Sequence, residues 1–292
     1  MIERLTLTAP AKVNLGLEVS GRRPDGYHDL CSILVNVDIS DSLVLEPGEG
    51  TTVGGEAATA AVEPGRELAS LALRGLEEIA GRPLGLGLRL RKQIPVGAGL
   101  GGGSADAAAV LRAAPRLGVE ASPAEVAALA LELGADVPFQ LTGGAALVGG
   151  VGEEVVPLPY REMWLAIAFG RLHVSTAAVF AELHPDEWTS GEVVATAAGR
   201  WRDGSPGLES ALEELPNTLW SPAARLHPGA LEEQASALEQ GGWLPRLTGS
   251  GSAMYQVCRD QAEARRLALS ASTLGFQAWA CRTLPAPEAP IE

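Results

Sequence analysis

A chain of 292 residues with 46% hydrophobic and 20% charged residues is long enough for one large domain or two, with cores that need no disulfide. Its formal net charge of −14 argues against a broad surface for nucleic acid or for an anionic membrane. Cys31, Cys258 and Cys281 contain no C-x-x-C pair, so we expect neither a disulfide framework nor a zinc cluster. Together with the lack of an apolar run as long as a membrane span, this composition indicates a reducing cytoplasm.

The first predicted element is a strand over residues 5 to 19, in which apolar and other side chains alternate. Val13, Leu15 and the following apolar residues face a core, which places Lys12 and Asn14 together on the opposite face. Two interpretations of that face stay open: the solvated surface of an edge strand, or a functional pair of an ammonium and an amide.

A tight turn is predicted at residues 22 to 26, where proline is followed by Asp-Gly, and Tyr27 and His28 come directly after it. These two residues suit the binding of a flat heterocycle, and the alternative is a hairpin tip with two amphipathic side chains. Strands are expected over residues 33–39 and 43–45, and a loop or irregular hairpin over residues 46–64.

The most informative segment is the loop Pro95-Val96-Gly97-Ala98-Gly99-Leu100-Gly101-Gly102-Gly103-Ser104-Ala105-Asp106. A helix over residues 66–80 and a strand over residues 84–90 precede it, and a helix with Ser104 as its N-cap follows it. Because glycines let backbone amides turn toward an anion, and a helix start carries unpaired N–H groups, we predict a phosphate site. Asp106 is either a helix-terminus charge turned away from the phosphate or part of a divalent-cation site.

The loop does not fit two common phosphate motifs. The Walker pattern needs a Lys directly before the Ser that opens the helix, and here Gly103 precedes Ser104. The dinucleotide pattern matches at the glycines, but residues 122–125 indicate a helix start where a Rossmann unit needs a strand that ends in an acid. A glycine-rich turn without a ligand is the remaining alternative.

Two further signals complete the first half of the chain. Ser122-Pro123-Ala124-Glu125 is a capping box that opens a helix ending at Gly134. Gly134-Ala135-Asp136-Val137-Pro138 then holds one carboxylate in a constrained turn, where Asp136 is either a cap or turn residue or a functional carboxylate. With a hairpin over residues 143–156, these elements form an expected first domain of residues 1–159.

The expected second domain, residues 160–292, begins with a buried strand over residues 164–169, and Phe180 lies on a short helix. A polar, irregular excursion is expected over residues 184–206, helices near 208–215, 229–240 and 260–271, strands over 253–257 and 276–281, and a loose end from residue 285. Strands and helices interleave without a long parallel βαβ series, which indicates the α+β class.

Three segments, Pro10-Ala11-Lys12-Val13-Asn14-Leu15, the glycine loop and Thr248-Gly249-Ser250-Gly251-Ser252, resemble in order and separation the three motifs of the GHMP small-molecule kinases. Arg23-Pro24-Asp25-Gly26-Tyr27-His28 and the segment around Asp136 resemble, within that superfamily, the 4-diphosphocytidyl-2-C-methyl-D-erythritol kinase family. The resemblance spans most of the chain. It implies a two-domain GHMP kinase fold, with a ribosomal-S5-domain-2-like N-terminal domain and a ferredoxin-like C-terminal domain.

The resemblance also implies an activity: ATP- and Mg²⁺-dependent phosphorylation of the 2-hydroxyl of the cytidyl-linked erythritol, in the non-mevalonate isoprenoid route, by a cytoplasmic monomer or homodimer. By position, Asp136 is the base, Lys12 is its partner and Asn14 lies beside the reacting hydroxyl. The loop holds the ATP phosphates through Pro95, Val96, Gly97, Ala98, Gly99, Leu100, Gly101, Gly102, Gly103, Ser104 and Ala105, and Tyr27, His28 and Phe180 hold the cytosine. No metal ligand is assigned. Phosphoryl transfer needs positioning and charge neutralisation more than covalent help, so these groups are a sufficient set.

The chain departs from the family pattern at three places. Glu67-Leu68 stands where relatives commonly have Asn-Leu near the adenine, Ser104-Ala105 replaces Ser-Ser, and Asn217-Thr218-Leu219-Trp220 replaces Asn-Asp-Leu-Glu. Two alternatives stay open: another GHMP kinase, which leaves the Asp-Gly-Tyr-His segment without a purpose, and a non-catalytic nucleotide- or RNA-binding module on an S5-like fold. The acidic net charge argues against RNA.

Overall fold

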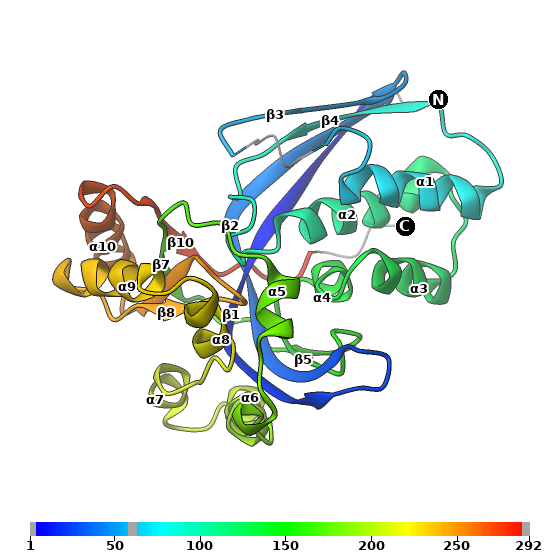
Figure 1. Ribbon diagram of the computed structural model, residues 1–292. Helices are drawn as coiled ribbons and strands as arrows, with labels where there is room; N and C mark the ends of the chain where they lie inside the picture. Colours follow the sequence, from blue (N-terminus) through cyan, green and yellow to red (C-terminus); the bar gives the residue numbers. More distant parts are fainter. Residues whose placement is uncertain (1–3, 58–62, 288–292) are drawn as a thin grey trace. The chain divides into compact units, whose positions relative to one another are not determined.

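The computed structural model describes residues 4–57 and 63–287 (Figure 1). By their contacts these residues form two compact units. Unit 1 contains the described residues of Met1–Ala11, Ile39–Val96 and Gly101–Thr142, and unit 2 contains those of Lys12–Asp38, Gly97–Leu100 and Gly143–Glu292. The division of the chain into domains of residues 1–159 and 160–292 stays a prediction.

Two long paired strands, β1 (Leu5–Arg22) and β2 (His28–Pro47), contribute residues to both units. In unit 1 the second part of β2 pairs antiparallel with β4 (Leu86–Arg91), and β4 pairs parallel with β3 (Thr51–Gly54). The helices of this unit are α1 (Leu68–Ala80), α2 (Gly102–Arg112), η1 (Ala114–Leu117), α3 (Pro123–Leu133) and α4 (Val137–Thr142). Helix α2 packs against α1, α3 and α4 and is thereby held in the interior of its unit (Figure 1).

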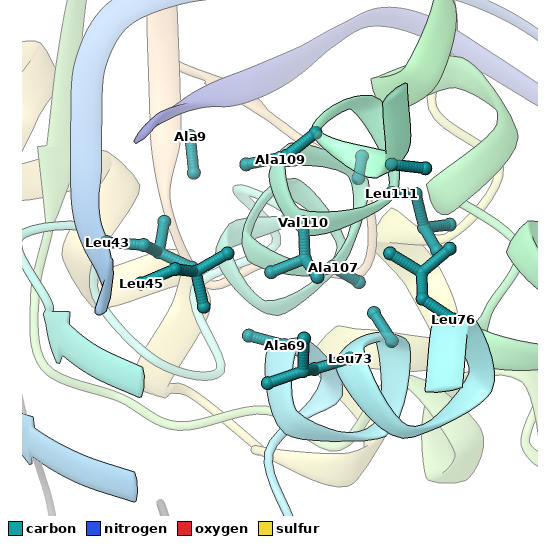
Figure 2. Packing of buried hydrophobic residues seen from close by; sticks show 14 of the residues in the cluster. Ala9, Leu43, Leu45, Ala69, Leu73, Leu76, Ala107, Ala109, Val110 and Leu111 are labelled. Atoms are coloured by element: carbon teal, nitrogen blue, oxygen red, sulfur yellow. The ribbon is translucent and has the colours of Figure 1, made fainter. Parts of the chain in front are cut away.

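The core of unit 1 is built from alanine and leucine (Figure 2). Ala107, Ala109 and Val110 of α2 pack with Leu73 and Leu76 of α1, and Leu43 and Leu45 of β2 close the same cluster. The small alanine side chains let the helices approach closely, so the position of α2 is set by packing along its length. That packing fixes where the helix begins.

Unit 2 contains a four-stranded antiparallel sheet in the order β10-β7-β9-β8. The strands of this sheet are β7 (Trp164–Phe169), β8 (Arg246–Leu247), β9 (Met254–Cys258) and β10 (Gln277–Arg282). Unit 2 also contains β5 (Ala145–Gly149), which pairs with the first part of β2, and β6 (Glu154–Leu158), which pairs with β5. Its helices are α5 (Thr176–Ala181), η2 (Pro185–Glu187), α6 (Glu192–Asp203), α7 (Leu208–Glu213), α8 (Trp220–Leu226), α9 (Ala230–Gln240) and α10 (Gln261–Thr273). Helix α10 packs on β7 and β10, and the separate helices and antiparallel pairs confirm the α+β class.

Elements with strong local signals form where the sequence predicts them. Ser122 and Glu125 make the reciprocal hydrogen bonds of a capping box at the start of α3. Asp260 accepts a hydrogen bond from the Glu263 amide and caps α10, and Gly81 ends α1 in the left-handed conformation. The hairpin of β5 and β6 and the strands β4, β7, β9 and β10 are also confirmed.

Three expectations about elements are wrong. The strands expected over 33–39 and 43–45 are one strand, because Asp41 is buried and accepts hydrogen bonds from the Gln93 and Ile94 amides instead of making a turn. Ser104 is not an N-cap, since α2 begins at Gly102 after Gly101 in the left-handed conformation. The excursion expected over 184–206 contains α6, whose buried side chains repeat at helical spacing (Val194, Ala197, Ala198, Trp201).

Two of the expected segments include residues that the structure does not describe. The loop expected over residues 46–64 contains β3, and residues 58–62 lie outside the described residues. Of the end expected to be loose, residues 288–292 lie outside them as well. Within the described ranges, no helix has both the length and the apolar character needed to cross a membrane.

The packing of α1 predicts unequal effects for two leucines of that helix. Leu76 is fully buried and Leu71 is 37% exposed. Leu76→Ala should lower the free energy of unfolding by about 2–5 kcal/mol, because it leaves a cavity against α2, whereas Leu71→Ala should cost less than about 1 kcal/mol. Urea denaturation of both variants measures the difference, and equal losses would contradict the packing in Figure 2.

Candidate functional site

Lys12 and Asn14 lie on β1 in the part of the strand that belongs to unit 2, and each is only 4% exposed. The Lys12 ammonium donates to Asn14 Oδ1 over 2.5 Å. An ammonium group is too costly to bury without partners, so this face of β1 is not the solvated surface of an edge strand. The functional interpretation of the pair stays a prediction.

Neighbouring hydroxyl groups fix the orientation of Asn14. Its Nδ2 donates to Ser32 Oγ over 2.8 Å, and Ser32 Oγ donates to the Gly16 carbonyl over 2.7 Å. Its backbone amide donates to Thr248 Oγ1 over 2.9 Å. Since Nδ2 is held by Ser32, Oδ1 is the amide atom that faces Lys12. Ser32 and Thr248 therefore orient the pair, although the sequence analysis assigned them no such role.

The first part of the glycine loop, Gly97–Leu100, also belongs to unit 2 and is held there by backbone hydrogen bonds. The Leu100 carbonyl accepts from the Lys12 amide over 3.0 Å, and the Ala98 carbonyl accepts from the Ala253 amide over 3.0 Å. A side chain at Gly99 would collide with the Thr248 carbonyl. The first and third sequence motifs are thus both in contact with this part of the loop.

The third motif is held by Asn217, which lies in the segment that departs from the family pattern. Asn217 Nδ2 donates to the carbonyls of Leu247 and Gly249 over 2.8 and 2.9 Å. A Cβ atom placed on Gly249 would lie 3.1 Å from Lys12 Nζ, so this glycine leaves room for the ammonium. Asn217 therefore shapes the loop beside Lys12, and no acidic residue is needed for that.

The second part of the loop, Gly101–Ala105, belongs to unit 1 and forms the start of α2. Gly101 precedes the helix with φ +68°, which is favourable for glycine alone among common residues. Ser104 is the third residue of the helix, and Ala105 is fully buried. The N–H groups of this first turn have no partner within the helix, so the start of α2 is suited to an anion.

Asp136 lies in unit 1 between α3 and α4. Gly134 ends α3, and the Asp136 carbonyl accepts the Gln140 amide over 3.0 Å at the beginning of α4. A Cβ atom built on Gly134 would lie 4.0 Å from Ser104 Oγ, so the turn that contains Asp136 lies next to the start of α2. Lys12 belongs to unit 2, and its expected partnership with Asp136 stays a prediction.

The residues expected to hold a heterocycle are in unit 2 and differ in exposure. The rings of His28 and Phe180 lie with centroids 5.3 Å apart at 34°, while Tyr27 is 63% exposed. Burial, with the nearby Arg22 charge as a second cause, lowers the pKa of His28. A neutral imidazole at physiological pH offers one donor and one acceptor to a base, and the pair of rings offers a stacking surface.

The structure gives partners to two acidic residues whose roles the sequence left open. Glu67, which stands at the family's adenine position, accepts hydrogen bonds from the Gly65 amide and the Ser70 hydroxyl. Asp106, expected to be either a helix-terminus charge turned away from the phosphate or part of a divalent-cation site, is buried and paired with Lys92. Lys92 also pairs with Asp41, so the three residues form one buried cluster. The sequence signal that could have pointed to it is the rarity of lysine, which the chain has at positions 12 and 92 alone. Within the described ranges, no three His, Cys, Asp or Glu residues gather in a way that could hold a metal ion.

Comparison with known proteins gives a consistent set of relatives. Residues 67–144 match the family model described as the GHMP kinases N terminal domain. The 4-diphosphocytidyl-2-C-methyl-D-erythritol kinase of Hahella chejuensis is 33% identical over 292 residues, covering 97% of this chain and 94% of the relative. That of Symbiobacterium thermophilum is 38% identical over 279 residues, covering 94% of this chain and 98% of the relative.

Solved structures agree with these relatives. A crystal structure of 4-(cytidine 5′-diphospho)-2C-methyl-D-erythritol kinase aligns with a TM-score of 0.77 at 34% identity, covering 96% of this chain and 99% of that chain. A homoserine kinase from Cytophaga hutchinsonii aligns with a TM-score of 0.72 at 18% identity, covering 99% of this chain and 97% of that chain, which shows a shared fold alone. The GHMP kinase fold and the resemblance found in the sequence are therefore confirmed.

The contacts of Gly99 predict that alanine is poorly tolerated there. Gly99 and Gly50 both have positive φ, at +77° and +78°, but a Cβ at Gly50 would meet open space. Gly50→Ala should cost about 1–2 kcal/mol for backbone strain alone, and Gly99→Ala should cost about 1–3 kcal/mol more, because it also collides with the Thr248 loop. Urea denaturation compares them, and equal losses would argue against the observed packing of the loop.

Proposed function

We propose that this chain, which belongs to the 4-diphosphocytidyl-2-C-methyl-D-erythritol kinase family of the GHMP kinases, transfers the γ-phosphoryl group of ATP to the 2-hydroxyl of 4-diphosphocytidyl-2-C-methyl-D-erythritol. This step belongs to the non-mevalonate route to isoprenoids. The observation that carries the proposal is near-full-length similarity to relatives of that name, together with the paired rings of His28 and Phe180. The other GHMP kinases in the comparison share the fold at less than 20% identity.

We assign the cytosine to Tyr27, His28 and Phe180. A base can stack on the pair of rings, and the neutral His28 imidazole can bond its edge. Cytosine offers a bare ring nitrogen and an amino group where uracil offers an N–H and a carbonyl, so a site that bonds the cytosine edge rejects uracil. The exposed Tyr27 is available to cover the base.

We assign the triphosphate to the segment Pro95–Ala105. Its glycines and the first turn of α2 supply backbone N–H groups and a partial positive charge, which suit a phosphate in a chain with a net charge of −14. The acidic chain otherwise repels ATP, so a local positive field is required.

We assign the base to Asp136 and the neutralising charge to Lys12. The 2-hydroxyl gives its proton to the Asp136 carboxylate as its oxygen forms a bond to the γ-phosphorus, and the bond from that phosphorus to the oxygen of ADP breaks. Lys12 and Asn14, which the structure orients through Ser32, stabilise the negative charge at the reacting oxygens. The assignment rests on the family resemblance and on the burial of the Lys12–Asn14 pair.

Magnesium is proposed to enter with ATP. The described residues contain no cluster of acidic or histidine ligands for a metal ion. Mg²⁺ commonly keeps several waters and takes its remaining oxygens from substrate phosphates and one or two carboxylates, so the lack of a dedicated cage is compatible with this ion. It supplies charge neutralisation at the β- and γ-phosphates.

The proposed compartment is the cytoplasm. All three cysteines are free thiols, and burial raises the pKa of Cys31 and of Cys258 to about 11, which makes them poor nucleophiles for disulfide exchange. Free, unreactive thiols suit a reducing compartment. Whether the enzyme is a monomer or a homodimer stays a prediction.

The function is tested by a coupled assay for ADP release with four acceptors: the cytidyl-linked erythritol, mevalonate, homoserine and galactose. Turnover of the cytidyl substrate alone is expected. Turnover of one of the other three alone would assign the chain to another GHMP activity, and ATP binding without any transfer would favour a non-catalytic nucleotide-binding module.

Replacing the proposed base should slow the chemical step. Asp136→Asn is expected to lower kcat by about 10²–10⁴ with little change in KM for either substrate, since it removes the proton acceptor and keeps the shape. Asp203→Asn, at the exposed end of α6, is the matched control and should leave kcat unchanged. A kcat for Asp136→Asn within a factor of about three of the unmodified enzyme would remove Asp136 from the role of base.

Removing the stacking partner should weaken binding of the substrate rather than chemistry. Phe180→Leu is expected to raise KM for the cytidyl substrate about tenfold, with KM for ATP unchanged, because stacking on a base is worth about 1–3 kcal/mol. Phe276→Leu also replaces a partly buried aromatic ring of unit 2 with leucine, so it controls for a general loss of stability. If both variants changed KM equally, Phe180 would have no special part in binding the base.

A further inference from the structure

Lys92, Asp41 and Asp106 form a buried charged cluster in unit 1, here called the anchor triad. The Lys92 ammonium donates to Asp41 Oδ2 and, over 2.6 Å, to Asp106 Oδ2. The three residues are 3%, 0% and 2% exposed. The proposed transfer of phosphate assigns no chemical step to a residue of the triad.

The anchor triad connects the two parts of the chain that flank Pro95–Ala105, here called the phosphate loop. Lys92 directly follows β4, and Asp41 Oδ1 accepts hydrogen bonds from the amides of Gln93 and, over 2.9 Å, Ile94, which lead into the loop. Asp106 lies on α2, four residues after Gly102, and so on the same face of the helix. A Cβ atom on Gly102 would lie 3.2 Å from Lys92 Nζ, which shows how closely the helix start rests on the triad.

The charges of the anchor triad do not balance if both carboxyl groups are ionised. One ammonium and two carboxylates then leave one net negative charge in the interior, directly behind the start of α2. Burial of an uncompensated charge is costly, and a group in such a place commonly changes its protonation state instead. Two carboxyl groups that share one site are the usual case in which one of them keeps its proton.

The hydrogen bonds distinguish the two carboxyl groups. Asp41 receives three: from the Lys92 ammonium and from the amides of Gln93 and Ile94. Asp106 receives one from Lys92, and its Oδ1 is buried with no hydrogen-bond partner within the described part of the chain. Hydrogen bonds to a carboxylate stabilise the ionised form, so Asp41 holds the charge and Asp106 is the group better suited to hold a proton.

We propose that Asp106 is a protonated carboxylic acid at neutral pH, which makes the anchor triad electrically neutral and lets it position both ends of the phosphate loop without opposing the charge of a bound triphosphate. Asp106 is thus a positioning residue that acts through Lys92. The part of this inference that concerns the triphosphate rests on the proposed function, and the protonation of Asp106 does not.

The charged surroundings of Asp106 support the same assignment. Burial raises the pKa of the Asp106 carboxyl, the attraction of Lys92 offsets only part of that rise, and the charge of Asp41 adds to it. The same two carboxyl groups raise the pKa of Lys92 against the effect of its burial, so the ammonium stays charged.

Within the residues that the structure describes, Lys92 and Asp41 are the charged groups that act on the Asp106 carboxyl. On α1, the Glu77 carboxylate accepts a hydrogen bond from the Leu84 amide. At the far end of α2, Arg112 donates a hydrogen bond to the Gln140 carbonyl of α4. The buried side chain of α3 is Ala130, which carries no charge. Lys92 and Asp41 are thus the charged groups that decide the state of Asp106.

Infrared spectroscopy tests the protonation directly. The difference spectrum between the full-length protein and Asp106→Asn at pH 7 should contain the carbonyl stretch of a protonated carboxylic acid, and this band should give way to a carboxylate band as the pH is raised. Because the measurement needs neither substrate nor activity, a protein that shows the band but does not phosphorylate the cytidyl substrate would contradict the proposed function alone. A difference spectrum with only carboxylate bands at pH 7 would overturn the protonation of Asp106.

The pH dependence of stability supplies a second test with a definite sign. The unfolded chain releases the Asp106 proton above about pH 4, whereas the folded chain keeps it, so raising the pH through this range favours unfolding by about tenfold per pH unit for this group. Asp106→Asn removes that contribution and should become progressively more stable than the unmodified protein between pH 5 and pH 7. A stability difference between the two proteins that stays constant over this range would mean that Asp106 is ionised in the folded chain, because the folded and unfolded chains would then bind the same number of protons.

Matched variants separate the two carboxyl groups. Asp106→Asn imitates the protonated state and should leave kcat and KM for ATP at pH 7 within about twofold, while Asp106→Ala should raise KM for ATP because Lys92 loses a partner. Asp41→Asn removes the ionised partner and should unfold far more easily than Asp106→Asn. Near-equal stability of Asp41→Asn and the unmodified protein would place the proton on Asp41 and overturn the assignment.

Discussion

The glycine-rich segment Pro95–Ala105 cannot hold a shape by itself, and this constraint explains much of the surrounding structure. Five of its residues are glycine, which has the largest conformational freedom in the unfolded chain and no side chain to pack. Its shape is therefore imposed from outside: in unit 2 by hydrogen bonds from Lys12 and Ala253, and in unit 1 by the packed helix α2 and the anchor triad beneath it. A loop ordered in advance binds a phosphate without the cost of becoming ordered first.

The sequence was informative wherever a local signal determines the outcome. The capping box at Ser122, the glycine that ends α1 and the alternation of β4 each act within a few residues, and all form as expected. One of the failures comes from a contact between distant segments. Ser40-Asp41-Ser42 has the composition of a turn, but the amides of residues 93 and 94 hold Asp41 inside a continuous strand. Helix α6 was missed because its four buried residues lie among polar ones that suggest a surface loop.

The two lysines of the chain show the same limit at the site itself. The functional role expected of Lys12 from its motif stays a prediction, and the structure adds that Lys12 is buried beside Asn14. The contacts that Ser32 and Thr248 make with Asn14 depend on strands and loops that only the fold brings together. Lys92 lies in no motif that the sequence analysis recognised. Its partners are 51 and 14 residues away, so its role could not be derived from spacing. The departure from the family pattern at Glu67 is likewise understood only from its hydrogen bonds, and so is the part that Asn217 has in holding the third motif.

Glycine in a phosphate loop is usually explained by the close approach of the ligand, but in this chain the protein's own packing also limits the side chains that fit at some of these positions. Gly99 lies against the Thr248 carbonyl, so a larger residue would be excluded there even with no ligand bound, and a Cβ atom at Gly102 would make tight contacts with Ile94 and Lys92. Gly103, in contrast, is exposed, and a Cβ there would make only ordinary contacts with Leu68. The protein's own packing therefore requires a glycine at Gly99 and restricts Gly102, whereas it leaves room for a side chain at Gly103.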